Sequence, residues 1–494
     1  MKKLIELFYK NVDMFPNKLA VICNEQSYSY KEFEELVNTQ INFLHEKNIK
    51  YKDNVGVLLP NDCNFIALIF AASALGISLT PLCPTQPEWA INTAFNAVDV
   101  KHVIGSKAVL SDLNLQLNGE IIDIDTINSN NTKRFIAPEL TGNEPLIFTM
   151  TSGSTGQPKP IVLSQRNKID RAFAAIELYS VTSDDIILAA TPLYHSLAER
   201  LVIMPLLIGA TSVLMPRFAP SLWLNTIKNH SVTFTIAVSS QLRQIAEVLT
   251  SPFLPEINSL RCIVSSSALL EPHTKKELVT KLNCDFHECY GTSEIAIATN
   301  LNIFDSKEKM NSVGKAIPNV DVKILRSNNT FANTDEIGEI VCKTPMLFMG
   351  YYKQEEKTKE SMFGEYFKTG DLGKIDKDGF LYFIDRQKDL IISGGINVYP
   401  NDIEQIAMQF EGIKECAAFP FPEENLGEIV AIAIVADKDF NLRKFKFHCA
   451  KKLADFQLPR KYFIVDSLPK NNMGKLTKHK LTEMFVEQEY SNVQ

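Results

Sequence analysis

A stretch rich in glycine and hydroxyl groups is the part of the chain best suited to bind an anion. Residues 151–159 read TSGSTGQPK and directly follow the apolar run LIFTM at 146–150. Glycines allow backbone N–H groups to converge on a phosphate without Cβ clashes, and hydroxyl and ammonium groups add further donors. These groups belong to Thr151, Ser152, Gly153, Ser154, Thr155, Gly156 and Lys159. The stretch predicts a phosphate-binding loop, with a plain surface loop as the alternative.

The spacing within this loop differs from that of a Walker A motif. A Walker A loop has four residues between its glycines and continues with Gly-Lys-Ser/Thr. Here the order is Gly153-x-x-Gly156-x-x-Lys159. A P-loop NTPase is therefore the weaker interpretation. Such an enzyme would release ADP and phosphate.

Five further motifs follow the loop toward the C-terminus. They are Tyr290-Gly291-Thr292-Ser293-Glu294; Lys368-Thr369-Gly370-Asp371; Asp385-Arg386-Gln387-Lys388-Asp389; Ser393-Gly394-Gly395 with Pro400 and Glu404; and Asn472-Met473-Gly474-Lys475. Together with the loop, these motifs resemble the signature of the adenylate-forming superfamily, which includes acyl-CoA synthetases, stand-alone adenylation domains and luciferases. The resemblance keeps the family's order from residue 151 to residue 475.

The resemblance implies a set of nucleotide and metal contacts. Glu294 would give Mg²⁺ a carboxylate, which suits ATP sites that hold the ion by one or two carboxylates plus phosphates. Asp371 would accept hydrogen bonds from the ribose diol, and Arg386 would contact ribose or phosphate. The other expected contacts are Thr155 at the metal, Tyr290 and Gly291 at adenine, Thr292 at the α-phosphate, and Ser267 and Ala268 beside the nucleotide. Without the resemblance, Asp371 would be a turn residue and Tyr290 a core residue.

Lys475 is the expected adenylation lysine. It lies in a basic stretch, Arg443 to Lys480, most of which belongs on a solvated face. The resemblance implies that Lys475 bridges the substrate carboxylate and the α-phosphate, where its charge would stabilise an in-line displacement. The expected catalytic residues are Lys475, Thr292, Glu294 and His195.

The resemblance also implies an acyl pocket and a thiol tunnel. His195 lies in TPLYHS (191–196), where acyl-CoA synthetases often carry PLFH, and it is expected where the two meet. The pocket set is His195, Ser196, Ser239, Ser265 and Ser266, and Gly394 and Gly395 would leave room for a pantetheine arm. Ser196 stands where enzymes of α-amino acids carry an aspartate, so an α-amino acid substrate is not expected. Glu199-Arg200 follows; it is expected to pair at a surface, and the alternative is a polar pocket.

These expectations describe a two-step ligase that forms acyl-AMP from a small carboxylic acid and ATP, and then transfers the acyl group to a thiol. Only 19 residues follow Lys475, too few for a carrier domain. The acceptor would be CoA, or the phosphopantetheine of a discrete acidic carrier protein; the PLxH context favours CoA. A catalytically silent nucleotide-binding scaffold is the third alternative. Retention of Lys159, Glu294, Asp371, Arg386 and Lys475 argues against it.

The elements that must position these residues follow an α/β pattern. Short apolar runs such as NVGVLLP (54–60) and TFTIAVSS (233–240) alternate with helical patterns, which predicts largely parallel sheets. From about residue 310 the chain is strand-rich, which predicts a β-barrel-like region. We expect an N-terminal adenylation domain of stacked αβ subdomains over 1–386. A hinge at 387–389 around Lys388 and a small mobile α+β C-terminal domain over 390–494 would follow.

Composition excludes several other classes. The 494 residues are 45% hydrophobic with a net charge of −7, which argues against disorder and against a nucleic-acid binder. Nine scattered cysteines without a CxxC pair suggest reduced, mostly buried thiols. The uncharged stretch 63–87 contains Gly76 and three prolines, so we expect a buried helix over 62–75 and a strand, not a transmembrane segment. With no signal peptide at the start, a cytoplasmic protein is expected.

Overall fold

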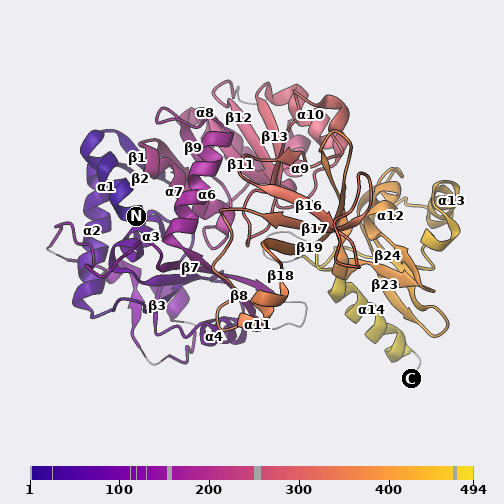
Figure 1. The fold of residues 1–494 in the computed structure, drawn as a ribbon, viewed down its shortest axis with the longest axis horizontal. Helices are drawn as coiled ribbons and strands as arrows, with labels where there is room; N and C mark the ends of the chain where they lie inside the picture. Colours follow the sequence, from indigo (N-terminus) through magenta and orange to yellow (C-terminus); the bar gives the residue numbers. More distant parts are fainter. Residues whose placement is uncertain are drawn as a thin grey trace. The chain divides into compact units, whose positions relative to one another are not determined.

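The computed structural model falls into two compact units, which are described separately. It describes residues 3–24, 26–111, 113–117, 119–129, 131–152, 158–249, 257–470 and 476–492. Unit 1 comprises Met1–Asp321 and Cys342–Phe367, and unit 2 comprises Val322–Val341 and Lys368–Gln494. Figure 1 shows the order of the elements along the chain.

A nine-stranded sheet forms the larger part of unit 1. Its strand order is β15-β14-β13-β12-β11-β9-β10-β1-β2. The bounds are β1 Leu19–Cys23, β2 Gln26–Ser29, β9 Ile186–Ala189, β10 Thr211–Leu214, β11 Phe234–Val238, β12 Cys262–Ser266, β13 Asp285–Tyr290, β14 Thr299–Asn302 and β15 Lys315–Ala316. The six strands from β13 to β1 are parallel, and β2, β14 and β15 add antiparallel edges. Parallel pairing brings the carboxyl ends of successive strands to one edge of the sheet, where open α/β sheets bind ligands.

A second, six-stranded sheet in unit 1 contains the strands on either side of the glycine-rich loop. Its order is β6-β5-β3-β4-β7-β8, with bounds β3 Asn54–Leu58, β4 Ser78–Pro81, β5 His102–Gly105, β6 Ile121–Asp123, β7 Pro145–Ser152 and β8 Pro158–Ser164. Strands β7 and β8 pair antiparallel, with Thr151 opposite Lys159. The hairpin therefore brings the two ends of the loop together.

Five helices of unit 1, α1, α2, α3, α6 and α7, share one hydrophobic core with strands of both sheets, and α4 packs into a second cluster. The bounds are α1 Leu4–Met14, α2 Tyr30–Glu46, α3 Cys63–Leu75, α4 Glu88–Ala97, α5 Lys107–Leu110, α6 Gln165–Leu178, α7 Ser196–Ile208, α8 Pro220–His230, α9 Ser239–Val248, α10 Pro272–Leu282 and α11 Glu355–Glu360. Helix α3 is buried along almost its whole length and ends at Gly76 in the left-handed conformation, as the sequence predicts. Helix α7 packs on α6, β9 and β10, and α9 packs on β11 and β12. This packing fixes the starts of α7 and α9 at the carboxyl edge of the large sheet.

The strand-rich region after residue 310 is an open sheet rather than a closed barrel among the described residues. Its path is β16-β17-β19-β18 with β20 paired to β19, and the bounds are β16 Asp321–Leu325, β17 Gly338–Lys343, β18 Met362–Phe363, β19 Tyr366–Ile375 and β20 Leu381–Arg386. Closure would require the edge strand β16 to pair with a strand at the opposite edge, and no such pairing occurs among the described residues.

The C-terminal part of unit 2 has the predicted α+β composition. Its sheet runs β22-β21-β24-β23 with β25 on β24, with bounds β21 Ile391–Ser393, β22 Ile396–Val398, β23 Ile413–Glu423, β24 Gly427–Ala436 and β25 Lys461–Ile464. The helices are α12 Pro400–Ala407, α13 Leu442–Lys452 and α14 Lys478–Asn492. Side chains of α12 and α13 pack into one hydrophobic cluster with β24, and those of α14 into another with β23.

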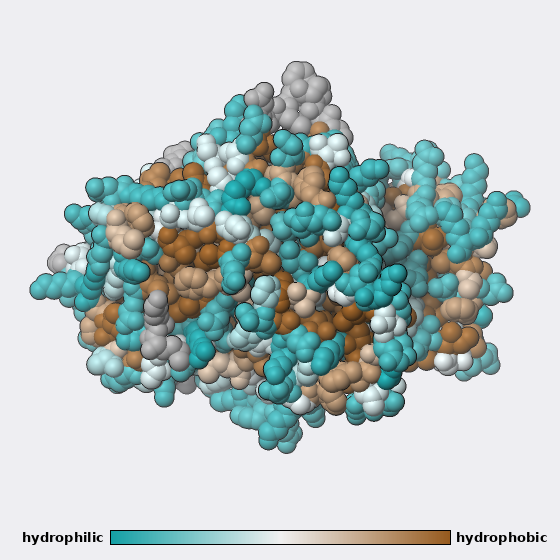
Figure 2. Space-filling model, turned by 45° about the horizontal axis from the view of Figure 1, so that its top comes forward, coloured by the Kyte–Doolittle hydropathy of each residue, from teal (hydrophilic) through white to brown (hydrophobic). Residues whose placement is uncertain are grey.

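The surface is largely hydrophilic and the cysteines are mostly buried thiols, as the composition predicts (Figure 2). Figure 2 shows hydrophilic side chains over much of the face in view, with hydrophobic side chains between them. All nine cysteines are free thiols, and eight of them are buried. Each helix in the described part of the chain is too short or too polar to cross a bilayer.

Candidate active site

The carboxyl edge of the large sheet brings together several of the predicted site residues. Strand β11 ends one residue before Ser239, β12 ends at Ser266, and β13 ends at Tyr290. These strands are adjacent and parallel, so Ser239, the segment 265–268 and the loop 291–294 lie at the same edge. The sequence positions are far apart, and only strand order brings them together.

The loop after β13 is held in a conformation that requires glycine. A Cβ on Gly291 would lie 1.6 Å from the carbonyl oxygen of Ala296. Ala296 has a φ of 61° and donates its N–H to the carbonyl of Thr292 at 2.9 Å. The Thr292 hydroxyl is buried and has no hydrogen-bond partner among the described residues. Because buried polar groups in folded proteins are nearly always satisfied, this hydroxyl is a candidate ligand contact.

Arg171 on α6 fixes the backbone that carries Glu294. Its guanidinium donates to the carbonyls of Ser293 at 2.9 Å and Glu294 at 2.7 Å, and to Met346 at 2.9 and 3.2 Å. Phe348 adds its N–H to the Glu294 carbonyl at 2.8 Å. The Arg171 side chain is 2% exposed, and burial lowers its pKa, with the Arg200 charge adding to this effect. One buried cation thus ties the helix after the glycine-rich loop to two other segments.

The side chain of Glu294 is held by Tyr351. The Tyr351 hydroxyl donates to Oε1 of Glu294 at 2.9 Å, and the Lys159 ammonium lies 3.9 Å from the centroid of the Tyr351 ring. Tyr351 reaches this place because the segment 349–352 is hydrogen-bonded to the backbone of β8. The N–H groups of Met349 and Tyr352 donate to the carbonyls of Val162 and Pro160, and the Val162 N–H donates to the Gly350 carbonyl. Burial raises the pKa of Tyr351, and the Glu294 carboxylate raises it further. Burial lowers the pKa of Lys159, an effect that Glu294 opposes.

His195 directly precedes α7 and Ser196 is its first residue. The His195 carbonyl accepts the N–H groups of Ala198 at 3.0 Å and Glu199 at 3.3 Å, and its ring meets Tyr194 edge-on at 4.5 Å. Its Nε2 is buried without a partner among the described residues. Burial lowers the pKa of His195 to about 4, so the imidazole is neutral at physiological pH.

The predicted serines form a connected group at the ends of β11 and β12. The Ser239 hydroxyl donates to the carbonyls of Ala268 and, at 3.5 Å, Ser266. Ser265 is fully buried, and its hydroxyl has no partner in the described part of the chain. Ser267 is exposed with a φ of 76°, and Ala268 is exposed as well. Ser239 therefore anchors the turn that contains the predicted nucleotide contacts.

The expectation that Glu199 and Arg200 pair at a surface is wrong. Glu199 is fully buried and pairs with Lys168 of α6, whose side chain is 4% exposed. Arg200, the next residue, has a buried Nε without an acceptor among the described residues. Helix α7 packs against α6, which turns the acidic side chain inward and separates the two neighbours.

In unit 2, Asp371 and Arg386 lie opposite each other on β19 and β20. The Arg386 Nε is 3.7 Å from Oδ1 of Asp371, and Asp371 is 6% exposed. Gly370 precedes Asp371 with a φ of 72° and donates its N–H to Glu339 Oε1 at 3.0 Å. The strand pair thus holds a carboxylate and a guanidinium side by side, as recognition of a sugar diol and a phosphate would require.

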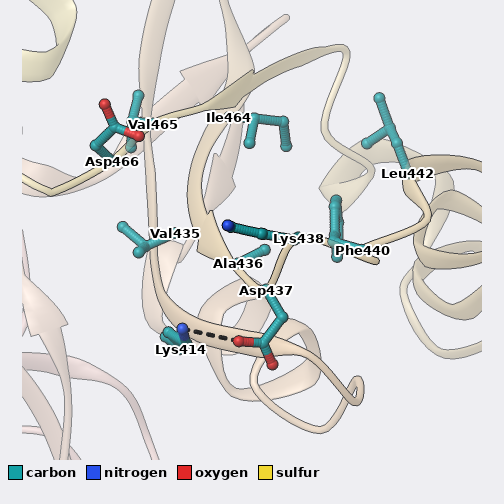
Figure 3. A pocket seen from close by; sticks show the side chains of 10 residues that line it. All are labelled: Lys414, Val435, Ala436, Asp437, Lys438, Phe440, Leu442, Ile464, Val465 and Asp466. Atoms are coloured by element: carbon teal, nitrogen blue, oxygen red, sulfur yellow. Dashed lines mark ion pairs between the residues drawn. The ribbon is translucent and has the colours of Figure 1, made fainter.

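The remaining predicted residues of unit 2 lie after β20. Lys388 is exposed in a 3₁₀ turn, Gln387–Asp389. Gly394, with a φ of 58°, lines a cavity of about 160 Å³, and Gly395 has a φ of 83° with open space around it. A larger cavity of about 540 Å³, with the Lys414–Asp437 ion pair of 2.8 Å on its wall, contains none of the predicted residues (Figure 3).

Part of the predicted set lies outside the described residues. Gly153, Ser154, Thr155, Gly156 and Lys475 belong to this part. For Thr151 and Ser152 the structure describes the backbone, which forms the end of β7, but not the side chains. Tyr351 and Arg171 were not among the sequence predictions, because nothing in the sequence places residues 57 and 123 positions away from Glu294 beside it.

Comparison with known proteins identifies the family. The sequence profile described as AMP-binding enzyme matches residues 8–352, and that of the AMP-binding enzyme C-terminal domain matches residues 402–475. The chain belongs to the AMP-binding enzyme family. This confirms the resemblance to adenylate-forming enzymes and the enzyme class, an AMP-forming acid–thiol ligase.

Relatives of this AMP-binding enzyme cover nearly its whole length. A 2-succinylbenzoate–CoA ligase of Oceanobacillus iheyensis is 27% identical over 96% of this chain and 98% of its own. The long-chain-fatty-acid–CoA ligase FadD13 of Mycobacterium tuberculosis is 28% identical over 92% and 93%. Among solved structures, ATP-bound MatB from Rhodopseudomonas palustris has a TM-score of 0.89 at 26% identity, covering 98% of this chain and 99% of that one.

The described residues of this AMP-binding enzyme fit a nucleotide with Mg²⁺. These described residues contain no group of three metal-ligating side chains, so they form no metal site from protein side chains alone. Mg²⁺ in ATP sites needs only one or two carboxylates, because phosphates and water complete its shell. Glu294, held by Tyr351 beside Lys159 and two residues from the unsatisfied Thr292 hydroxyl, meets that requirement.

Proposed function

We propose that this protein is an AMP-forming acyl-CoA ligase. It converts a carboxylic acid and ATP to acyl-AMP and pyrophosphate, and then transfers the acyl group to CoA with release of AMP. The observation that carries the proposal is the group formed by Glu294, Tyr351, Lys159 and the unsatisfied hydroxyl of Thr292. The names of the relatives support CoA as acceptor, since both the 2-succinylbenzoate and the long-chain-fatty-acid enzymes are CoA ligases.

Residues of unit 1 contact the phosphates in this proposal. Glu294 and Thr155 would hold Mg²⁺, which neutralises phosphate charge when it is bound. The glycine-rich loop, Thr151–Gly156, cradles the β- and γ-phosphates with Lys159, and the Thr292 hydroxyl donates to the α-phosphate. A donor that is already fixed and desolvated stabilises charge that develops in the transition state without reorganisation.

The rest of the nucleotide is bound by residues with matching polarity. Tyr290 and Gly291 contact adenine, together with Ser267 and Ala268. Asp371 accepts the ribose hydroxyls and Arg386 contacts ribose or phosphate, which suits the adjacent carboxylate and guanidinium on β19 and β20.

Adenylation is a displacement at the α-phosphorus by the substrate carboxylate. Lys475 bridges the attacking carboxylate and the α-phosphate oxygen, and the oxygen that links the α- and β-phosphates leaves with pyrophosphate. Positioning and electrostatics supply most of the rate in such transfers. Lys475→Ala should therefore reduce acid-dependent pyrophosphate release by orders of magnitude while ATP binding is nearly unchanged.

Thioester formation uses a second arrangement of the chain. The segment 390–494 moves about the hinge 387–389 at Lys388 relative to the N-terminal domain, 1–386. Gly394 and Gly395 then line the passage of the pantetheine arm. The thiol sulfur attacks the acyl carbonyl, the bond to AMP breaks, and the thiol proton leaves to solvent or base. His195, neutral because of burial, adds no charge beside the incoming carboxylate in the pocket of Ser196, Ser239, Ser265 and Ser266.

A product assay tests the proposal directly. Purified protein is incubated with Mg-ATP and a panel of carboxylic acids, and AMP, ADP and acyl-CoA are measured by mass spectrometry with and without CoA. Acid-dependent AMP together with acyl-CoA is the expected result. ADP as the product would refute adenylation, and acyl-AMP that accumulates and ignores CoA would assign a carrier protein as acceptor.

A further inference from the structure

Asn61 links the two sheets of unit 1 through three hydrogen bonds of one amide. It lies between β3 of the six-stranded sheet and α3, and it is only 9% exposed. Its Nδ2 donates to the carbonyls of Thr191 at 3.1 Å and Met215 at 2.8 Å, and its Oδ1 accepts the N–H of Leu193 at 2.8 Å. All three partners follow the carboxyl ends of β9 and β10 in the nine-stranded sheet.

Among short side chains, only a carboxamide meets the three bonding requirements of this position. The two carbonyls need two donors, and the Leu193 N–H needs an acceptor. A carboxylate has no donor, and a hydroxyl has only one. A buried backbone group that loses its partner costs free energy. Each short replacement of Asn61 would therefore leave part of the loop after β9 unsatisfied.

These bonds fix the segment that leads to His195. Thr191 and Leu193 precede His195 by four and two residues. The His195 N–H donates to the carbonyl of Pro192 at 3.1 Å, which closes a turn around Leu193. The carbonyl of His195 then accepts N–H groups from the first turn of α7. The place of Leu193 therefore determines where His195 and the start of α7 lie.

The same segment carries two polar side-chain atoms without partners. Oγ1 of Thr191 and Nε2 of His195 are both buried, and neither has a hydrogen-bond partner among the described residues. Thr191 as a whole is 5% exposed. Buried polar side-chain atoms nearly always have a partner, so two such atoms on one short segment point to a ligand. Asn61 bonds only the backbone here, which leaves both side chains available to that ligand.

We infer that Asn61 is a positioning residue of the acyl site, which holds the segment 191–195 so that the Thr191 hydroxyl and the His195 imidazole contact the carboxylic acid. The amide reaches no substrate itself and acts through these two side chains. Small displacements of positioned groups are costly in catalysis, so loss of the amide should weaken use of the acid. The inference rests on the proposed function, because it takes a carboxylic acid as the substrate beside His195.

The kinetics of Asn61→Ala and Asn61→Asp test the inference. Pyrophosphate release is measured with the acid that the wild type activates best, first with the acid varied and then with ATP varied. Both variants should raise the KM for the acid by about tenfold or more, and the KM for ATP by less than about twofold. Asn61→Asp should have the larger effect, because its carboxylate would face two carbonyl oxygens.

A second background distinguishes positioning from general destabilisation. In the double variant Thr191→Val/His195→Ala, the side chains through which Asn61 acts are gone, whereas the backbone acceptor of Thr191 remains. Adding Asn61→Ala to this background should change the KM for the acid by less than about twofold, since residues that act as a unit are not additive. A purely structural effect of Asn61 would instead multiply with the effect of the background.

Asn11 provides a matched control. Its Nδ2 also donates to two backbone carbonyls, those of Leu7 at 3.1 Å and Leu206 at 3.0 Å, and it is 6% exposed. Leu206 lies near the other end of α7. Asn11→Ala should therefore lower the melting temperature about as much as Asn61→Ala does, and leave the KM for the acid unchanged.

Several outcomes would overturn the inference and leave the proposed function intact. These are a lower melting temperature of Asn61→Ala with an unchanged KM for the acid, an equal rise in the KM for acid and ATP, or an effect that multiplies in the double background. Failure of both Asn61 variants to fold would also overturn it, because the amide would then be structural. Absence of acid-dependent pyrophosphate from the wild type with every acid would instead refute the proposed function.

Discussion

The hydroxyl of Tyr351 donates a hydrogen bond to Oε1 of Glu294 at 2.9 Å, although 57 residues separate the two. The same ring lies beneath the Lys159 ammonium at 3.9 Å. Tyr351 thus contacts both an anionic and a cationic member of the proposed phosphate and metal site. Its hydroxyl restricts the orientation of the carboxylate, and its ring face attracts the ammonium.

Tyr351→Phe should weaken the response to Mg²⁺. Removing a hydrogen bond to a charged group costs about 1.5–3 kcal/mol where the partner stays buried, so part of the orientation of Glu294 is lost. We expect the Mg²⁺ concentration for half-maximal pyrophosphate release to rise by about tenfold, because Glu294 is only half-buried and 1.4 kcal/mol is a factor of ten. The cation–π contact with Lys159 is retained, so the KM for ATP should change less.

The adjacent tyrosine provides a matched control. The Tyr352 hydroxyl also donates to a carboxylate, Asp99, at 2.8 Å. This pair is exposed, and neither residue belongs to the proposed phosphate and metal site. Tyr352→Phe should leave the Mg²⁺ dependence unchanged. If both variants behaved alike, Tyr351 would have only a structural role; if Glu294→Gln also left the Mg²⁺ dependence intact, the assignment of Glu294 would be wrong.

Gly291→Ala should abolish adenylation by displacing the loop that carries Thr292 and Glu294. The new Cβ would overlap the Ala296 carbonyl at 1.6 Å, and backbone cannot yield as a flexible side chain can. We expect at least a hundredfold loss of acid-dependent pyrophosphate release, because small misplacements of positioned groups cost that much.

A glycine with open space around it provides the comparison for Gly291. Gly412 has a φ of 88°, and no atom lies within 4 Å of the position that a Cβ would take. Gly412→Ala therefore introduces only backbone strain of about 1–2 kcal/mol. It should lower the melting temperature slightly and leave pyrophosphate release unchanged. Near-normal activity of Gly291→Ala would show that the loop is not rigid.

Glu199→Leu should destabilise the protein strongly. The change leaves Lys168 buried without its partner and beside the Arg171 and Arg200 charges. Breaking a buried ion pair costs about 3–5 kcal/mol, whereas replacing both partners by apolar residues is often neutral. Urea unfolding should show a large loss for Glu199→Leu and recovery in Lys168→Met/Glu199→Leu. A loss of less than about 1 kcal/mol in the single variant would indicate that water reaches Lys168 and solvates it.

The sequence predicts the alternation of strands and helices well because the buried strands are continuous apolar runs. The β9 run Ile186–Ala189 is an example, and it pairs in parallel with β10. The glycine-rich loop and the motif at 290–294 are local patterns, so the sequence also predicts that each lies near the end of a strand. These features depend on neighbours in sequence.

The contacts that complete the site are not local and escape prediction. Arg171 follows the glycine-rich loop as an ordinary helical residue, and its acceptors are carbonyl oxygens of remote segments, which carry no sequence signal. The burial of Glu199 likewise depends on how α6 packs on α7. Its adjacency to Arg200 in the sequence therefore does not predict its ion-pair partner, which is Lys168. Open-sheet geometry after residue 310 depends on strand lengths that the turn residues leave undefined.

Burial of His195 should make folding stability depend on pH below neutrality. The pKa of His195 is about 4 in the folded protein, against 6.5 for an ordinary histidine, and desolvation of the charged ring is the cause. Between these two values the unfolded chain binds a proton that the folded chain does not. Folding stability therefore falls as pH decreases from about 6.5 toward 4, and His195 contributes no pH dependence above that window.

His195→Gln should remove this dependence. At about 1.36 kcal/mol per pH unit, the wild type loses about 2 kcal/mol between pH 7 and pH 5 through this residue. Urea unfolding at the two pH values should show a loss for the variant that is smaller by that amount, because all other titrating groups are shared. An equal loss in both proteins would mean that the imidazole takes up its proton in the folded state with an ordinary pKa, and that the ring is open to water at the start of α7.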